Sequence, residues 1–225
     1  MPRNSSLSHV LFSIAGAAAV SFSPLLAEGS AQALPAMSTT SPNFGSNAPF
    51  TLGYSFTVNS PITVTHLGAY DVGADGLAEA HTVGLWNAAG TLLASTSVPN
   101  GTTAALDANN QFRIVPIANL NLSVGTQYVV GAVFPTGNDL WAFAAQRTTA
   151  PQITFVDGRF TSGASLAFPG STDTNAYLGG SFEFTPTPVP FAFNPLFGVG
   201  VLGLSQARRA LKRRNEKQPS TRADA

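Results

Sequence analysis

Hydrophobic and polar residues alternate through the middle of the chain with the two-residue period of β-strands. From residue 50 to residue 58, Phe, Leu, Tyr, Phe and Val alternate with Thr, Gly and Ser, which predicts a strand with one buried face. Runs of the same character predict further strands over residues 62–70, 82–86, 91–98, 111–117, 127–134, 141–146, 153–157 and 177–184.

Polar turns separate these short strands, and this spacing is typical of an all-β sandwich. Asn87, Ala88, Ala89 and Gly90 join two of the runs, and the glycine supplies the positive φ that a tight hairpin needs. We therefore expect a single β-sandwich domain of jelly-roll type over residues 50–184, preceded by a linker over residues 34–49.

The first 33 residues have the three parts of a secretory signal peptide. Arg3 provides the positive region, an apolar run extends over residues 10–26, and Ala31 and Ala33 form the small-residue pattern that precedes a cleavage site. We predict cleavage after Ala33. The alternative is a retained transmembrane helix, but polar residues between 21 and 28 interrupt the run before it reaches the ~20 residues of a span.

The C-terminal part of the chain predicts a short membrane anchor. A Pro/Thr spacer over residues 185–190 leads into an apolar stretch, and its uncharged, proline-free part (196–207) would form a helix about 18 Å long. That is short for a bilayer core of about 30 Å, so the span would be strained or would thin the bilayer. The alternative is an amphipathic helix packed on the domain.

A basic cluster ends this anchor segment, which covers residues 191–214, and would keep the C-terminus on the cytoplasmic side. The residues of this stop signal are Arg208, Arg209, Lys212, Arg213 and Arg214. The polar residues 215–225 are expected to be a disordered tail.

The order of spacer, apolar stretch and basic cluster resembles the PEP-CTERM sorting signals that exosortases process in Gram-negative bacteria. The motif residues are Val189, Pro190, Phe191, Phe193 and Pro195. They are closest to the cyanobacterial variant that begins Pro-Phe-Glu-Phe, with Ala192 in place of the Glu. The resemblance implies export machinery and an exosortase-like enzyme as partners, delivery to the cell envelope, and an association with exopolysaccharide.

Charge is distributed unevenly along the chain. Charged residues make up only 10% of it, below the roughly 25% of ordinary soluble domains, and seven of the eleven Lys and Arg residues follow residue 207. Residues 34–190 carry a net charge of −5, which argues against nucleic acid as a partner because phosphate binding needs clustered basic residues. The absence of cysteine excludes disulfides, thiolate metal sites and a lipidated N-terminal cysteine.

Two central segments, residues 81–94 with a Leu-Trp hairpin and residues 125–130 with Gly-Thr-Gln-Tyr, resemble a family of bacterial extracellular β-sandwich domains of unknown function. The resemblance implies a display or recognition domain and carries over no catalytic residue. The enzyme motifs of serine hydrolases, zinc proteases and phosphate-binding loops are missing from the sequence. We expect His66 and His81 to be hydrogen-bonded or solvent-facing rather than ligands or bases.

Asp71, Asp75 and Glu79 lie in one glycine-containing loop, where carboxylates could bind calcium, the one cofactor that the sequence suggests. Their spacing does not fit the twelve-residue calcium loop, so solvated acids are the simpler interpretation. Trp86 and Tyr70 are candidates for stacking on a sugar ring, with core packing as the alternative.

Together these features predict an exported protein of the cell envelope, the outer surface or the extracellular matrix, anchored to the membrane by its C-terminal segment. It would display a β-sandwich with a structural role or an association with extracellular polysaccharide. A carbohydrate-binding module is the first alternative, and a secreted glycan hydrolase the second. We expect no enzymatic activity.

Overall fold

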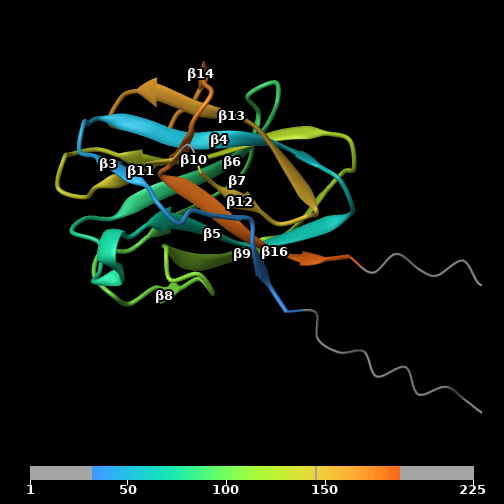
Figure 1. Cartoon of the computed structure of the whole chain (residues 1–225), viewed down its shortest axis with the longest axis horizontal. Coiled ribbons are helices and arrows are strands. Elements are labelled where there is room, and N and C mark those ends of the chain that lie inside the picture. The colour runs from blue at the N-terminus through green and yellow to red at the C-terminus, as the bar shows by residue number, and fades with distance from the viewer. Residues whose placement is uncertain (1–31, 145, 188–225) are drawn as a thin grey trace, which may run out of the picture. The chain divides into compact units, whose positions relative to one another are not determined.

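Two antiparallel sheets of long strands face each other in the computed structural model, which describes residues 32–144 and 146–187 (Figure 1). The six-stranded sheet has the order β14-β13-β4-β10-β6-β7. Its strands are β4 (Phe50–Val58), β6 (His81–Asn87), β7 (Leu92–Val98), β10 (Gln127–Phe134), β13 (Ile153–Ser162) and β14 (Ser171–Asp173).

The opposing sheet has five strands in the order β1-β16-β5-β9-β8. They are β1 (Leu34–Pro35), β5 (Ile62–Tyr70), β8 (Ala105–Leu106), β9 (Phe112–Leu122) and β16 (Gly180–Pro186). Among the long strands, the chain stays within the six-stranded sheet from β6 to β7 and from β10 to β13, and otherwise it changes sheet at each step.

Two small sheets and one helical turn complete the described residues. The three-stranded sheet β15-β11-β3 consists of β3 (Asn43–Gly45), β11 (Trp141–Ala144) and β15 (Ala176–Leu178). The two-stranded sheet pairs β2 (Met37–Ser38) with β12 (Thr148–Thr149). A 3₁₀ turn, η1 (Val72–Ala74), follows β5, and the part of the chain that the structure describes has no helix with the length and apolar character of a membrane span.

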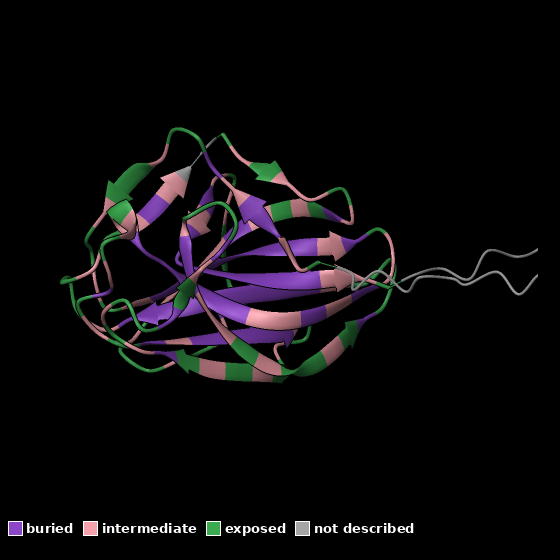
Figure 2. Cartoon of the chain, turned by 90° about the horizontal axis from the view of Figure 1, so that it is seen from below, coloured by how far each residue is buried: buried purple, intermediate pink, exposed green. Residues whose placement is uncertain are grey.

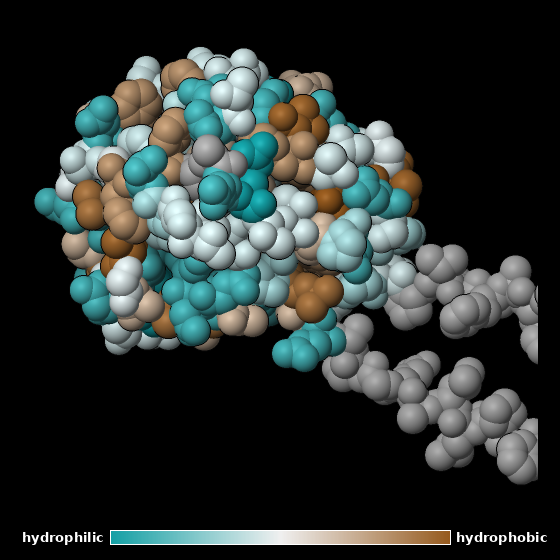
Figure 3. All heavy atoms as spheres, in the orientation of Figure 1, coloured by the Kyte–Doolittle hydropathy of each residue, from teal (hydrophilic) through white to brown (hydrophobic). Residues whose placement is uncertain are grey.

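Aromatic side chains fill the space between the two large sheets. Phe56 on β4 packs against Phe182 on β16 with ring centroids 4.8 Å apart, and the Tyr54 hydroxyl lies 3.0 Å from the Ser181 hydroxyl. All four residues are buried, and the central strands are purple along most of their length in Figure 2. Hydrophobic residues on the face shown in Figure 3 are divided into separate patches by polar ones.

The two sheets approach each other closely where β16 crosses β10. Gly180 is buried, and a Cβ atom at this position would lie 2.5 Å from the carbonyl carbon of Gly131. At the preceding position, a Cβ atom on Gly179 would lie 2.8 Å from the Leu52 carbonyl oxygen on β4. Only glycine fits these two positions, because any side chain would force the sheets apart.

The long strands of the structure confirm the strands that the alternation of hydrophobic and polar residues predicts. The predicted strands over residues 50–58, 62–70 and 127–134 have the same bounds in the structure, and the turn after Asn87 closes the β6–β7 hairpin with Gly90 at a φ of 85°. The predicted strand over residues 177–184 is divided, because the chain leaves the three-stranded sheet at β15 and enters the five-stranded sheet at β16.

The predicted linker over residues 34–49 is wrong, because this segment forms part of the fold. Its strands β1, β2 and β3 pair with β16, β12 and β11. Strands of two or three residues are too short to show a period in the sequence. The predicted spacer also begins too early, because Thr185 and Pro186 belong to β16 and the Thr187 amide donates to the Pro61 carbonyl.

The sandwich has two distinct ends. At one end lie Val58, Ile62 and the end of β16, and the chain also enters here, because Leu34 pairs with Phe184. We call this the tethered end. The opposite, distal end contains the first residue of β4, the last residue of β5 and the first residue of β16. The predicted signal peptide up to residue 31, and the segments predicted after residue 187, lie outside the described residues.

Replacing Gly180 with Ala tests the close approach of the two sheets. We expect the free energy of unfolding to fall by about 1–3 kcal/mol, because the new methyl group overpacks the contact with Gly131. Urea denaturation measures this change. The matched control is Gly170→Ala, since a Cβ atom there has its nearest neighbours at 3.9 Å. Equal stability of the two variants would contradict the packing described.

Candidate functional site

An ion pair with β9 organises the acidic loop after β5. The Arg113 Nε donates to Asp71 Oδ2 at 2.7 Å, and both residues are buried. The same guanidinium donates to the Ala74 carbonyl at 2.8 Å and to the Ala104 carbonyl at 3.1 Å. Arg113 therefore holds the loop of residues 71–76 and the segment before β8 against the start of β9.

The three predicted calcium ligands are separated by these contacts. Asp71 also accepts from the Gly76 amide, Asp75 is exposed, and Glu79 accepts from the amide and hydroxyl of Thr136. The structure therefore does not bring Asp71, Asp75 and Glu79 together. The sequence could not reveal the competing partner of Asp71, because Arg113 lies 42 residues away.

Glu79 instead joins a group that the sequence analysis missed. Ligand atoms of Glu79, His81 and Asp139 all lie within 4.8 Å of one another. His81 is fully buried at the start of β6, and its Nε2 lies 2.8 Å from Asp139 Oδ2. The proximity of Glu79 and His81 in the sequence is a weak signal for such a group, and Asp139, 58 residues after His81, has none.

The two aromatic residues proposed for sugar stacking are buried. Tyr70 is 5% exposed and packs edge-on against Phe112 with ring centroids 5.1 Å apart. Trp86 is 4% exposed because its ring lies over Gly84 on one side and meets Phe168 on another. The prediction that these rings stack on sugars is wrong for this structure, since neither ring has a face open to a ligand.

A different set of aromatic residues lies around a hollow at the distal end. Trp141 on β11, Phe160 on β13 and Tyr177 on β15 are partly exposed and line a hollow of about 140 Å³. Asn47, Phe50 and Leu52 complete its lining. We call this hollow the Trp141 pocket.

Local contacts fix the rings of the Trp141 pocket. The Trp141 indole packs over Gly45, where a Cβ atom would lie 2.4 Å from the ring, and its Nε1 donates to the Asn47 carbonyl at 3.2 Å. The Trp141 and Tyr177 rings are inclined by 62°, with centroids 5.6 Å apart. The two rings therefore form the walls of a pocket and not a flat platform.

Tyr177 links the pocket to a polar rim. Its hydroxyl donates to Asp173 Oδ2 at 2.9 Å, and burial together with this bond raises the pKa of Tyr177 to about 12. The pKa of the Asp173 carboxyl is lowered by the Asn175 amide and by the Tyr177 hydroxyl. The rim thus keeps a negative carboxylate at neutral pH and a phenol that stays protonated.

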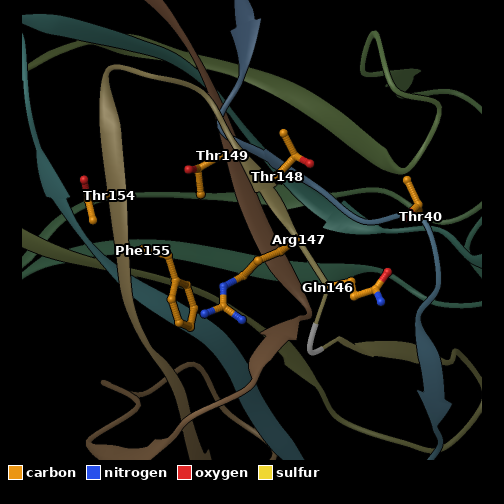
Figure 4. Close-up of a pocket in the computed structure, with 7 residues that line it drawn as sticks. All are labelled: Thr40, Gln146, Arg147, Thr148, Thr149, Thr154 and Phe155. Atoms are coloured by element: carbon orange, nitrogen blue, oxygen red, sulfur yellow. The ribbon is translucent and has the colours of Figure 1, made fainter.

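A larger, polar groove lies towards the other end of β13 (Figure 4). It has a volume of about 610 Å³ and is lined by Thr40, Gln146, Arg147, Thr148, Thr149, Thr154 and Phe155. The Arg147 guanidinium lies over the Phe155 ring, 3.5 Å from its centroid. Hydroxyl, amide and guanidinium groups can all hydrogen-bond to a polar ligand, but the one aromatic face in this groove is covered by Arg147.

The described domain matches one family of proteins, the "domain of unknown function (DUF4082)", over residues 36–178. The chain belongs to this DUF4082 family. The match begins at Ala36 and ends at Leu178, so it includes β2, β3 and the residues of both hollows. No curated protein and no solved structure matches the DUF4082 chain significantly.

Replacing Arg113 with Met tests the ion pair that organises the acidic loop of this DUF4082 domain. We expect the free energy of unfolding to fall by about 3–5 kcal/mol, because Asp71 would remain as an unpaired buried charge. Thermal and urea denaturation measure the loss. The matched control is Arg159→Met. Its ion-pair partner Asp157 is 24% exposed, so removing this pair should lower the free energy of unfolding by no more than about 1 kcal/mol. A smaller loss for Arg113→Met than for the control would refute this role.

Proposed function

We propose that this chain is an exported, non-catalytic module of the cell envelope that associates with extracellular polysaccharide through the Trp141 pocket. The observation that carries the proposal is the place of this pocket: its partly exposed aromatic rings lie at the distal end of a domain whose described chain enters and leaves at the tethered end.

The bounds of the fold support export and anchoring. The predicted cleavage site after Ala33 is followed directly by Leu34, the first residue of β1, so removal of the signal peptide would leave the sheet intact. The last described contact of the fold is made by Thr187, within the Pro/Thr spacer that leads to the predicted anchor and sorting segment. A membrane attachment through that spacer would hold the tethered end nearest to the bilayer.

The distal end would then be presented away from the membrane. Phe160 pairs with Leu52 near the start of β4, whereas Ile153, at the other end of β13, pairs with Val58. These seven intervals along β13 correspond to about 23 Å at the usual rise of a strand. The Trp141 pocket is therefore accessible to a polymer in the matrix outside the cell.

The chemistry of the pocket favours a neutral sugar. Aromatic faces bind the apolar face of a sugar ring at a low entropic cost, and the inclined walls suit a single ring or a chain end better than a flat crystalline surface. Asp173 at the rim and the net charge of −5 between residues 34 and 190 disfavour anionic polymers.

Replacing Trp141 with Ala tests the pocket. We expect the variant to lose about tenfold to a hundredfold in affinity, because removing one aromatic contact costs on the order of 1–3 kcal/mol. Binding is measured on an array of neutral and acidic bacterial, algal and plant polysaccharides, and then by titration with the oligosaccharide that binds best.

Two variants serve as controls for this experiment. Phe44→Ala removes an aromatic side chain that is 51% exposed on the neighbouring strand and should leave binding unchanged. Trp141→Phe keeps an aromatic wall and should retain part of the affinity. Binding that is confined to acidic polymers, insensitive to Trp141→Ala or absent from the whole array would exclude a sugar-binding pocket and leave a structural role.

Export is tested by intact-mass measurement of the protein in fractions of the native host. We expect a form that begins at Leu34 in the envelope or the medium, with or without the residues after Pro190, depending on processing. The mass of each form identifies its ends. Full-length protein that starts at Met1 and remains in the cytosol would refute the proposal of export.

A further inference from the structure

Glu79, His81 and Asp139 form a second cluster at the distal end, independent of the Trp141 pocket. His81 is the first residue of β6, and Asp139 lies in the loop between β10 and β11. Their ligand atoms lie within 4.8 Å of one another. His81 is fully buried, whereas Glu79 and Asp139 lie nearer the surface.

The hydrogen bonds of His81 determine the role of each of its two ring nitrogens. Nδ1 lies 2.9 Å from the Val133 carbonyl oxygen, which only accepts, so Nδ1 carries a hydrogen and donates it. In the neutral imidazole, Nε2 is then a bare lone pair directed at the Asp139 carboxylate, 2.8 Å away. Two lone pairs at this distance repel, so a proton or a cation must lie between them.

A metal ion meets this requirement with little movement. Tetrahedral ligands about 2.1 Å from one ion are about 3.4 Å apart, so Nε2 and Oδ2, now 2.8 Å apart, would separate by about 0.6 Å. The Glu79 carboxylate oxygen, which lies within 4.8 Å of the other two ligand atoms, would move inward by at most about 1.4 Å to complete the set. A histidine that ligates through one nitrogen commonly donates its other N–H to a backbone carbonyl, as His81 does.

The two carboxylates are held in place by donors outside the triad of side chains. Asp139 accepts from the backbone amides of Ala78 and Glu79 at 2.8 and 3.0 Å. Glu79 uses Oε1 to accept from the amide and hydroxyl of Thr136, which leaves Oε2 for a cation. These bonds orient both carboxylates before any ion binds.

We propose that Glu79, His81 and Asp139 form a binding site for a divalent transition-metal cation, with Zn²⁺ as the best match. One imidazole nitrogen and two carboxylate oxygens suit Zn²⁺, whereas Ca²⁺ prefers six to eight oxygen ligands. The partly exposed side of the cluster leaves a fourth position for water. The ion would link the loop of residues 135–140 to the start of β6. Its ligand Asp139 lies two residues before Trp141.

The experiment measures metal binding directly and does not depend on any glycan. The full chain, purified without a histidine tag and stripped with EDTA, is titrated with Zn²⁺ by calorimetry, and its melting temperature is recorded with and without Zn²⁺ and Ca²⁺. We expect one Zn²⁺ per chain and a higher melting temperature with Zn²⁺ but not with Ca²⁺. Cobalt provides a second readout, because its visible spectrum reports on coordination.

Variants assign the ligands. Because Glu79 lies near the surface, the Glu79→Gln variant should fold normally but bind Zn²⁺ at least tenfold more weakly. The Asp139→Asn variant should lose Zn²⁺ binding. The matched control is His66→Gln. Like His81, His66 has a carboxylate nearby, that of Glu183 at 3.9 Å, but it lies outside the cluster. This variant should bind Zn²⁺ as the unaltered chain does.

Three results would overturn the proposal: the absence of stoichiometric Zn²⁺ binding, binding that persists unchanged in both Glu79→Gln and Asp139→Asn, or equal loss in His66→Gln. Nitrogen NMR of the imidazole separates the remaining cases. A His81 ring that carries hydrogens on both nitrogens in the presence of Zn²⁺ would show that a proton alone joins His81 to Asp139.

Discussion

The packing of β16 across β4 and β10 is the contact on which the rest of the fold depends. Phe182 and Ser181 on β16 meet Phe56 and Tyr54 on β4, and Gly180 allows the backbones to touch at the distal end of this crossing. Along this short strand, Gly180 is followed at every second position by a large aromatic side chain, Phe182 and then Phe184. The aromatic residues set the distance between the sheets over most of the crossing, and the glycine allows the sheets to converge where β16 begins.

Strand β13 lies near one edge of the six-stranded sheet, and its distal half packs against β15 rather than against the five-stranded sheet. The chain covers it with the three-stranded sheet β15-β11-β3, whose strand β15 immediately precedes β16. Strands of three or four residues cannot bury a surface as completely as long ones, so Trp141, Phe160 and Tyr177 remain partly exposed. The Trp141 pocket is therefore a consequence of how the sandwich closes, and its walls come from the small sheet and the adjoining edge of the large one.

The sequence predicts the long strands well because alternation is a local property. It does not predict β1 to β3, which are too short to alternate, or the burial of Trp86, because the outward side of its strand is covered by Phe168, 82 residues later in the chain. The predictions of site residues are wrong for a related reason, because their partners lie far away in the sequence. The spacing of the acidic residues suggests a calcium site, but in the structure the Asp71 carboxylate is paired with Arg113. Asp139 lies far from His81 in the sequence, and only folding brings the two side chains together.

Backbone hydrogen bonds close both ends of the sandwich, and the distal end adds two side-chain pairs. At the tethered end, backbone groups bond to each other: the Gly125 amide donates to Val58 and the Asn59 amide to Gln152. At the distal end, buried side chains hold the loops, namely Arg113 with Asp71 and His81 with Asp139. Backbone bonds tolerate most substitutions, whereas these side-chain pairs each depend on particular residues. The loops at the distal end can therefore change with a few substitutions while the sheets remain the same, which would suit the proposed binding of a ligand at this end.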